Sequence, residues 1–222
     1  MIDNSIDRGA RVYTPLTLRM YDWYVLGLSN RFAWGCPTRK ILLPFFQRHM
    51  ARRHLDVGVG SGFYLANSTI SSTAEISLLD LNRNSLDATM KRIKGSNPRC
   101  IQQDIFQPLT LEGNVLFDSI STFYLLHCLP GTFVEKQKVI VNLMRHLAPD
   151  GVLYGATILG DTVNHNGFGR VLMRAYNGKG IFCNREDTLP MLRKMLESLF
   201  QQVDISLHGK VALFTVKLAK NL

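Results

Sequence analysis

Cysteine is scarce in this 222-residue sequence and its four copies are scattered. They form no C-x-x-C pair, which argues against a zinc knuckle or a redox-active dithiol. The four are Cys36, Cys100, Cys128 and Cys183. We therefore expect reduced thiols in a cytoplasmic protein.

Long apolar runs are also lacking. No stretch approaches about 18 uninterrupted apolar residues, and the N-terminal MIDNSIDRGAR has no apolar signal core. The sequence therefore predicts no membrane-spanning segment and no membrane partner. With 46% hydrophobic and 19% charged residues, the chain can bury one sizeable core, so we expect a single compact domain.

Acidic residues are rare in the first quarter of the chain. Lys and Arg outnumber Asp and Glu by 9 to 3 in residues 1–54 and by 17 to 14 in the remainder. The same segment is rich in aromatic residues, namely Tyr13, Tyr21, Trp23, Tyr24, Phe32 and Trp34. This mixture suits a lid over an aromatic small molecule or a surface that stacks on nucleic-acid bases. No Lys/Arg run exceeds two residues, which favours the lid.

Short apolar strands alternate with amphipathic helices along the rest of the chain. Helices are predicted at 16–32, 37–53, 63–70, 83–93 and 133–147. Strands are predicted at 54–59, 75–80, 99–104, 115–122 and 151–159. This alternation implies an α/β fold with a parallel, doubly wound sheet. Residues 200–208 and 210–218 flank Gly209 and predict a closing antiparallel hairpin.

The turn after the first predicted strand carries three glycines, Gly58, Gly60 and Gly62, in the stretch HLDVGVGSG. Ligands of open α/β sheets bind beyond the carboxyl ends of the strands, and glycine lets the backbone approach them closely. Asp80 ends the second strand, where a carboxylate can accept both hydrogen bonds of a ribose diol. The alternative explanations are tight strand–helix packing for the glycines and a simple helix cap for Asp80.

Two classes of nucleotide site compete for this pattern. A dinucleotide fingerprint, G-x-G-x-x-G, needs glycine at the position of Phe63, so that pattern is not met. The ordered motifs LDVGVGSG, LLDLN, QQDIF and DSISTFYLLHCLP resemble those of class I S-adenosylmethionine-dependent methyltransferases. The resemblance covers about residues 50–218 and is greatest to the UbiE-like and small-molecule enzymes. It implies a seven-stranded sheet ending in an antiparallel hairpin, with residues 1–50 as a helical lid and 51–222 as the core.

This resemblance implies a role for each motif. Asp56 and the three glycines would cradle the methionine part of S-adenosylmethionine, and Asp80 would hold the ribose. The adenine would lie against Leu81, Asp104 and Ile105. Thr122, Phe123 and, as a further hypothesis, Tyr21 would lie beside the methionine part. S-adenosylhomocysteine would be the product.

Several subclasses of methyltransferase do not match this sequence. The fourth strand ends in STFYLLHC and lacks the N/D-P-P-Y/F tetrad of enzymes that methylate adenine or glutamine amides. Nothing after Asp118 resembles the oxygen-rich ligand cluster of a metal-dependent enzyme, so no metal is expected. Cys36-Pro37 has the wrong order and place for a cytosine-C5 nucleophile. The reaction type that remains is direct transfer of the methyl group by in-line displacement.

The acceptor contacts are predicted outside the cofactor core. Candidates are Tyr13 and Trp34 in the lid and, between the fifth strand and the last helix, His165 and Tyr176. The alternatives, which the sequence favours, are a surface position for His165 and helix packing for Tyr176. His127, just beyond the fourth strand, is a candidate general base, with a purely structural role as the alternative.

The sequence therefore predicts a methyltransferase that modifies an O, N, S or C atom of a small, aromatic-type molecule in secondary metabolism. Its partners would be the small-molecule acceptor and, at most, a second copy of the chain, as a monomer or homodimer; nucleic acid is not favoured. An RNA methyltransferase and a non-catalytic cofactor-binding module are the alternatives.

Overall fold

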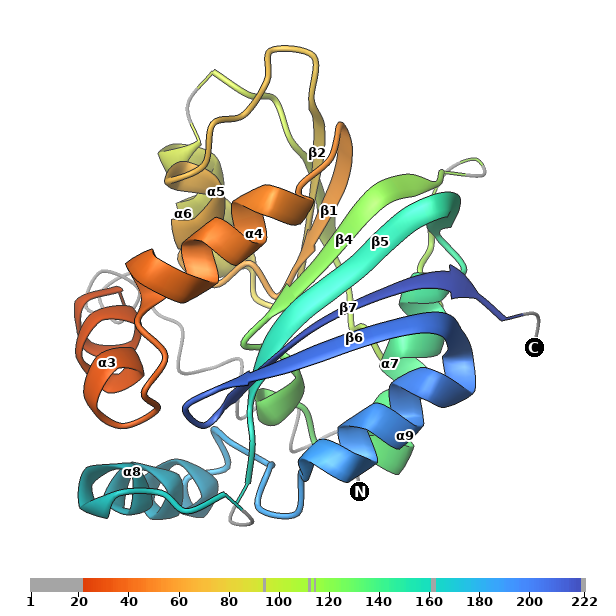
Figure 1. Ribbon diagram of the computed structural model, residues 1–222. Coiled ribbons are helices and arrows are strands. Elements are labelled where there is room, and N and C mark those ends of the chain that lie inside the picture. Colours follow the sequence, from red (N-terminus) through yellow and green to blue (C-terminus); the bar gives the residue numbers. More distant parts are fainter. Residues whose placement is uncertain (1–21, 94, 112, 114, 161–162, 221–222) are drawn as a thin grey trace.

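Residues 22–220, except 94, 112, 114, 161 and 162, are described by the computed structural model of the chain (Figure 1). A seven-stranded sheet has the order β3-β2-β1-β4-β5-β7-β6. Its strands are β1 (Arg53–Val57), β2 (Glu75–Asp80), β3 (Arg99–Gln102), β4 (Phe117–Phe123), β5 (Leu147–Ile158), β6 (Phe200–His208) and β7 (Val211–Ala219). Strands β1 to β5 run parallel, and β7 is antiparallel to β5 and β6. The predicted sheet with its closing hairpin is confirmed.

Helices cover both faces of the sheet (Figure 1). One face carries α4 (Leu43–His49), α5 (Phe63–Ala66) and α6 (Arg83–Arg92), and the other carries α7 (Phe133–Met144) and α9 (Leu189–Leu199). Because side chains alternate along a strand, Leu78 of β2 packs into the core beneath α4–α6 and Leu79 into the core beneath α7 and α9. The sheet is therefore packed between two apolar cores, which fix the positions of its strand ends.

Polar caps determine where the helices after β2 and β4 begin. The Asn82 side chain accepts a hydrogen bond of 2.8 Å from the Asn84 N–H at the start of α6. Thr132 and Glu135 form a reciprocal capping box at the start of α7. Helix α6 therefore begins three residues after the end of β2, and α7 begins ten residues after the end of β4.

Three helices end earlier than their periodicity predicts. The helix predicted to 53 ends at His49 because Arg53 already pairs in β1, and the one predicted to 70 ends at Ala66. Helix α7 ends at Met144 rather than at 147. Leu147 instead pairs with Phe117, before the β4–β5 register shifts. Strand pairing thus limits α7 and the helix before β1, whereas α5 ends well before β2 begins.

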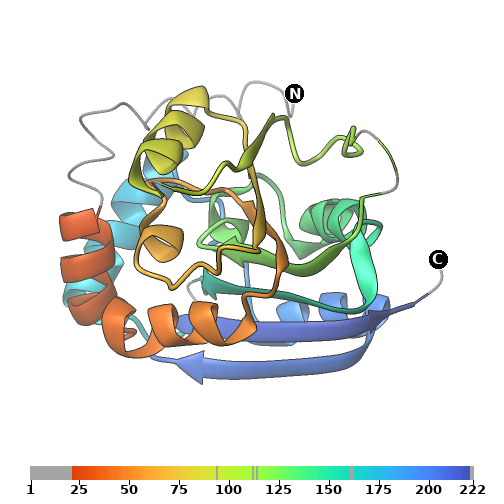
Figure 2. The same cartoon turned by 90° about the horizontal axis from the view of Figure 1, so that it is seen from above.

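The N-terminal helices lie at the same end of the molecule as α8 (Gly167–Gly178), as Figure 2 shows. They are η1 (Asp22–Ser29), α3 (Asn30–Phe32) and η2 (Thr38–Leu42), which leads into α4. The Asn166 side chain just before α8 donates a 2.7 Å hydrogen bond to the Phe32 carbonyl. Leu42 and Phe46 of the predicted lid are fully buried in the core. The division into a lid over 1–50 and a core over 51–222 stays a prediction.

Within the ranges that the structure describes, no helix is both long enough and apolar enough to cross a membrane.

Candidate active site

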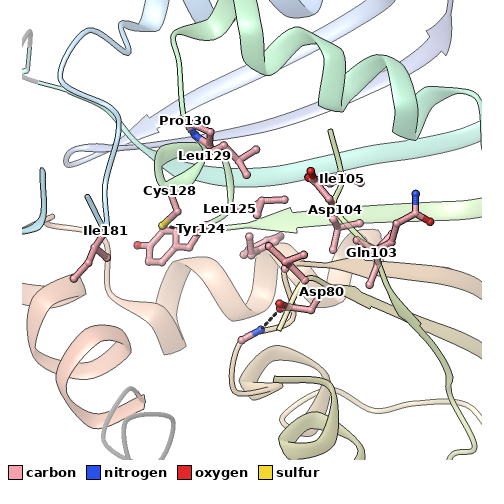
Figure 3. A pocket seen from close by; sticks show the side chains of 16 residues that line it. Asp80, Gln103, Asp104, Ile105, Tyr124, Leu125, Cys128, Leu129, Pro130 and Ile181 are labelled. Carbon is pink, nitrogen blue, oxygen red and sulfur yellow. Dashed lines mark hydrogen bonds between the residues drawn. The ribbon is translucent and has the colours of Figure 1, made fainter. Parts of the chain in front are cut away.

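A cavity opens where the parallel strands β1, β2 and β4 end (Figure 3). Its walls comprise Val57, Gly58, Gly60, Leu79–Leu81, Gln103–Ile105, Phe123–Leu125, Cys128–Pro130 and Ile181. A smaller hollow shares Gly58, Gly60, Phe123 and Tyr124 with it and adds, among others, Asp56, Ser61 and Tyr64. We call these two adjoining spaces the strand-end cavity. It lies where open α/β sheets bind their ligands.

The three glycines of the first turn have different tasks. All have positive φ, which side chains other than glycine rarely adopt. A Cβ on Gly62 would lie 2.7 Å from the Thr89 hydroxyl of α6, so this glycine permits close helix packing. A Cβ on Gly58 would lie 2.9 Å from the Leu125 side chain. Only Gly60 has nothing within 4 Å of that point, so among the three it is Gly60 that keeps space open for a ligand.

Asp80 presents its carboxylate to the cavity from the end of β2 (Figure 3). One oxygen accepts a 2.8 Å hydrogen bond from the Asn82 N–H, and the other lies 3.4 Å from the Gly60 N–H. Burial raises the pKa of Asp80 to about 6, and these backbone hydrogen bonds oppose the rise. Held by two backbone turns, the carboxylate is preorganised to accept hydrogen bonds from a diol.

Asp56 ends a chain of buried hydrogen bonds. Ser119 Oγ accepts from the Ala51 N–H at 2.8 Å, so its hydroxyl can donate to His54 Nδ1, also at 2.8 Å. The ring hydrogen then belongs on Nε2, which lies 3.2 Å from Ser121 Oγ, and Ser121 donates to Asp56 at 2.5 Å. We call this the His54 chain. It holds the Asp56 carboxylate toward the hollow.

The ionisation of the groups in the His54 chain follows from their burial. Burial lowers the pKa of His54 to about 3, so its ring stays neutral. Burial raises the pKa of Asp56 to about 7, while the Ser121 hydrogen bond lowers it and nearby Asp80 adds to the rise. A cation placed in the hollow would therefore find an acid that ionises near neutral pH.

The predicted adenine contacts lie along the cavity wall. Leu81, Asp104 and Ile105, which the family resemblance assigns to the adenine, all line it. Asp104 is fixed by a 2.9 Å hydrogen bond from the Phe106 N–H, and the Ile105 carbonyl accepts 2.9 Å from the Asn142 side chain. Gln103, which the sequence did not single out, lines the same wall.

The end of β4 differs from its prediction in one side chain. Phe123 lines both parts of the strand-end cavity, but Thr122 is fully buried and its hydroxyl lies 3.5 Å from the Tyr154 carbonyl of β5. Successive side chains of a strand point to opposite faces, which explains the difference. Tyr124 was missed by the sequence argument. It has positive φ, lines both spaces, and donates a 2.9 Å hydrogen bond to the Asn30 side chain.

His127 lies behind the cavity wall rather than on it. Its side chain is 2% exposed, its ring is 4.5 Å from that of Phe182, and its Nδ1 accepts from the Ile158 N–H at 3.3 Å. Burial, with a smaller effect of the Lys136 charge, lowers its pKa to about 3. This placement favours the structural alternative over the general base.

The predicted acceptor contacts cluster among themselves instead of on the cavity wall. Trp34 is 1% exposed, with its ring 5.7 Å from that of His165 and 6.2 Å from that of Phe182. His165 is buried beside the Gly160 carbonyl at 3.0 Å, and Tyr176 packs on Phe182 at 4.9 Å. Neither part of the strand-end cavity includes Trp34, His165 or Tyr176 in its wall. Tyr13 and Tyr21 lie outside the described residues.

No group of three or more His, Cys, Asp or Glu side chains in the described part of the chain could hold a metal ion.

A glycine turn, a carboxylate at the end of the second strand and an antiparallel closing hairpin together define a methyltransferase-type α/β protein. Residues 55–153 match the family model described as a methyltransferase domain. The O-methyltransferase of the physcion biosynthesis cluster of Aspergillus chevalieri is 38% identical over 208 residues, covering 94% of each chain. The chain therefore belongs to the methyltransferase family.

Two further comparisons show similarity over most of the chain. The uncharacterised protein YbcY of Escherichia coli (strain K12) is 49% identical over 191 residues, covering 86% of this chain and 97% of YbcY. Among solved structures, a DhpI–SAH complex has a TM-score of 0.67 with 13% identity, covering 99% of this chain and 98% of that one. At this identity the structural likeness shows the fold alone.

Proposed function

We propose that this protein uses S-adenosylmethionine to methylate a hydroxyl group of a small molecule. The observation that carries the proposal is the pairing of Asp80 with the open space at Gly60, where three strand ends meet. Similarity to O-methyltransferases over nearly the whole chain supports the reaction class.

The strand-end cavity fits the parts of this cofactor. Asp80 would accept the ribose hydroxyls, and Leu81, Asp104 and Ile105 suit an adenine because they offer apolar surface and a carboxylate acceptor. Asp56 in the adjoining hollow suits the cationic amine of the methionine part. When bound, S-adenosylmethionine supplies a methyl group activated by a positively charged sulfur.

The aromatic wall of the hollow suits that positive charge. The rings of Phe123 and Tyr64 lie 4.7 Å apart, and both residues line the hollow with Tyr124. Aromatic faces attract cations, more strongly when water is excluded. These residues would orient the cofactor and keep water away, so that alignment provides most of the rate acceleration.

The proposed acceptor atom and the proposed class of acceptor molecule are based on the relatives. They include enzymes named as O-methyltransferases and one named as an N-methyltransferase, so nitrogen is the second candidate atom. Neither an RNA methyltransferase nor a non-catalytic module receives support from the family match or these relatives.

The test is methyl transfer to a panel of small molecules. The protein is incubated with S-adenosylmethionine and either hydroxylated aromatics, aromatic amines or total RNA, and mass spectrometry follows the added methyl group. We expect methylated hydroxyl groups with the wild type and none with Gly60→Val. Methylation of RNA alone would overturn the proposal, and methylation of amines alone would correct the acceptor atom.

A further inference from the structure

A wide groove adjoins the strand-end cavity. It lies between the N-terminal helices and the helices α5 and α6, and has a volume of about 740 Å³. Small-molecule sites commonly measure about 300–1,000 Å³. The groove is therefore large enough for an acceptor of several rings.

Four cationic side chains line this groove, which we call the basic groove: Arg31, Arg39, Lys40 and Arg92. All four are exposed, and no Asp or Glu is part of the lining. Arg39 lies 5.7 Å above the Phe63 ring, and Arg92 donates a 2.9 Å hydrogen bond to the Ser61 carbonyl. The clustered positive charge favours an anionic ligand.

The basic groove and the strand-end cavity are neighbours. Leu26 and Phe63 line both the groove and the hollow that contains Asp56 and Gly60. The groove and the hollow therefore lie next to each other, with Leu26 and Phe63 between them. This arrangement distinguishes the groove from an unrelated basic surface.

No histidine is placed to act as a base for an acceptor hydroxyl. None of the six histidines of the chain lines the strand-end cavity or the basic groove. His54, His127 and His165 are buried with hydrogen-bond partners of their own. The carboxylates of Asp56 and Asp80 are the groups assigned above to the cofactor. An acceptor that arrives already ionised needs no base.

We propose that the basic groove binds the methyl acceptor as an oxyanion, so that the substrates are acidic aromatic hydroxyls, that is, phenolates or enolates. This inference rests on the proposed function and narrows its substrate class. A lone pair of the oxyanion forms the new O–C bond while the electron pair of the S–C bond goes to sulfur. The sulfonium and oxyanion charges disappear together, and no proton has to be removed during transfer.

The test uses 4-nitrophenol, whose phenolate absorbs visible light, as the probe. Cations near a bound phenol favour its ionised form. We expect the wild-type protein to bind the phenolate at least about tenfold more tightly than the phenol, which lowers the pKa of the bound probe by about one unit. Absorbance titrations against pH measure this shift without any turnover.

Two variants test whether the shift arises in the groove. Arg31→Gln with Arg39→Gln should abolish the preference for phenolate, because both side chains are exposed and their loss leaves the core intact. Lys194→Gln, an exposed cation on α9 outside the groove, is the matched control and should leave the shift unchanged. An unshifted probe in the wild type, or an equal loss in the control, would overturn the inference.

Affinity for S-adenosylhomocysteine separates the remaining outcomes. If the arginine variants lose this affinity as well as phenolate binding, the groove serves the carboxylate of the cofactor and the inference is wrong. If a short RNA binds through these arginines while the probe does not, the partner is nucleic acid and the inference is again wrong. A wild type that binds the phenolate but not S-adenosylhomocysteine would refute the proposed function instead.

Discussion

The strand-end cavity and the basic groove share a wall but carry opposite charge. Asp56, Asp80 and Asp104 line the two spaces of the cavity, whereas the groove is lined by three arginines and a lysine. The cavity therefore matches the cationic cofactor, and the groove matches an anion. Electrostatic attraction would therefore direct the cofactor to the cavity and an anionic acceptor to the groove before any specific contact forms.

The two regions also differ in how rigidly they hold their charges. The carboxylate of Asp80 is bound by backbone N–H groups, and that of Asp56 by the His54 chain. Burial raises the pKa of both acids toward neutrality. The groove cations are exposed at the ends of long side chains, which have more rotamer freedom than the buried carboxylates. The comparison indicates a preorganised cofactor site beside an adaptable acceptor site.

The largest effect is expected from filling the open space in the cavity. Gly60→Val would place a branched side chain at φ +53°, where the space for the cofactor lies. Binding of S-adenosylhomocysteine, measured by calorimetry, should fall by at least about a hundredfold, or roughly 3 kcal/mol. Gly178→Ala, at another open glycine but with ordinary φ, should bind normally. Tight binding by the valine variant would place the cofactor elsewhere.

The acidic character of the cavity predicts a pH dependence. Because the pKa of Asp56 is raised to about 7, its carboxylate is ionised only above that pH. Affinity for S-adenosylhomocysteine, whose amine is cationic, should therefore be full above pH 7 and fall below it by up to about tenfold per pH unit. Calorimetry between pH 5 and pH 9 measures this. A flat profile would exclude Asp56 from the amine contact.

The same raised pKa has a consequence for the stability of the free protein. An acid whose pKa is higher in the folded than in the unfolded state stabilises the fold at low pH and loses that contribution as pH rises from about 4 to about 7. Asp56→Asn should thus raise the melting temperature at pH 8 more than at pH 4. Equal changes at both pH values would contradict the raised pKa.

Substitutions in the His54 chain should cause a smaller and more selective change, in the pKa of Asp56. Ser121→Ala removes the hydrogen bond that lowers the pKa of Asp56, so the midpoint of the binding profile should move to higher pH, by about half to one unit. Ser119→Ala, two links further from Asp56, should move it less. An equal shift in both variants would point to a general loss of packing.

The smallest effect on turnover is expected at His127. Its ring is buried and neutral, so His127→Gln should lower the melting temperature while kcat changes by less than about threefold at temperatures where the variant is folded. A loss of kcat of a hundredfold, with the acidic limb of the pH–rate profile removed, would restore the general-base role.

Much of the lining of the strand-end cavity could be predicted because its residues follow strands directly in sequence. Gly60, Asp80 and Asp104 each come at or just after a strand end, and parallel strands bring these ends together. Thr122 was expected to lie beside the cofactor together with Phe123 but is buried away from the cavity, because the sequence does not show which face of β4 each side chain occupies.

The acceptor side could not be predicted in the same way. Trp34 and His165 are far apart in sequence, and only the tertiary fold shows that they pack on each other in the core. Arg31 and Arg92 likewise come together through helix packing that no local pattern records. The basic excess of residues 1–54 was visible in the sequence, but not that Arg92 of α6 would line the same groove as Arg31.

The most direct test of the account is the affinity of S-adenosylhomocysteine for Asp80→Asn, measured by calorimetry beside the wild type. We predict a loss of about 2–3 kcal/mol, or roughly 30- to 150-fold, because the carboxylate would accept two hydrogen bonds from the ribose. Asp204→Asn, an exposed carboxylate on β6, is the control and should bind as the wild type does. Equal affinity of Asp80→Asn and the wild type would contradict the assignment of the strand-end cavity to the cofactor.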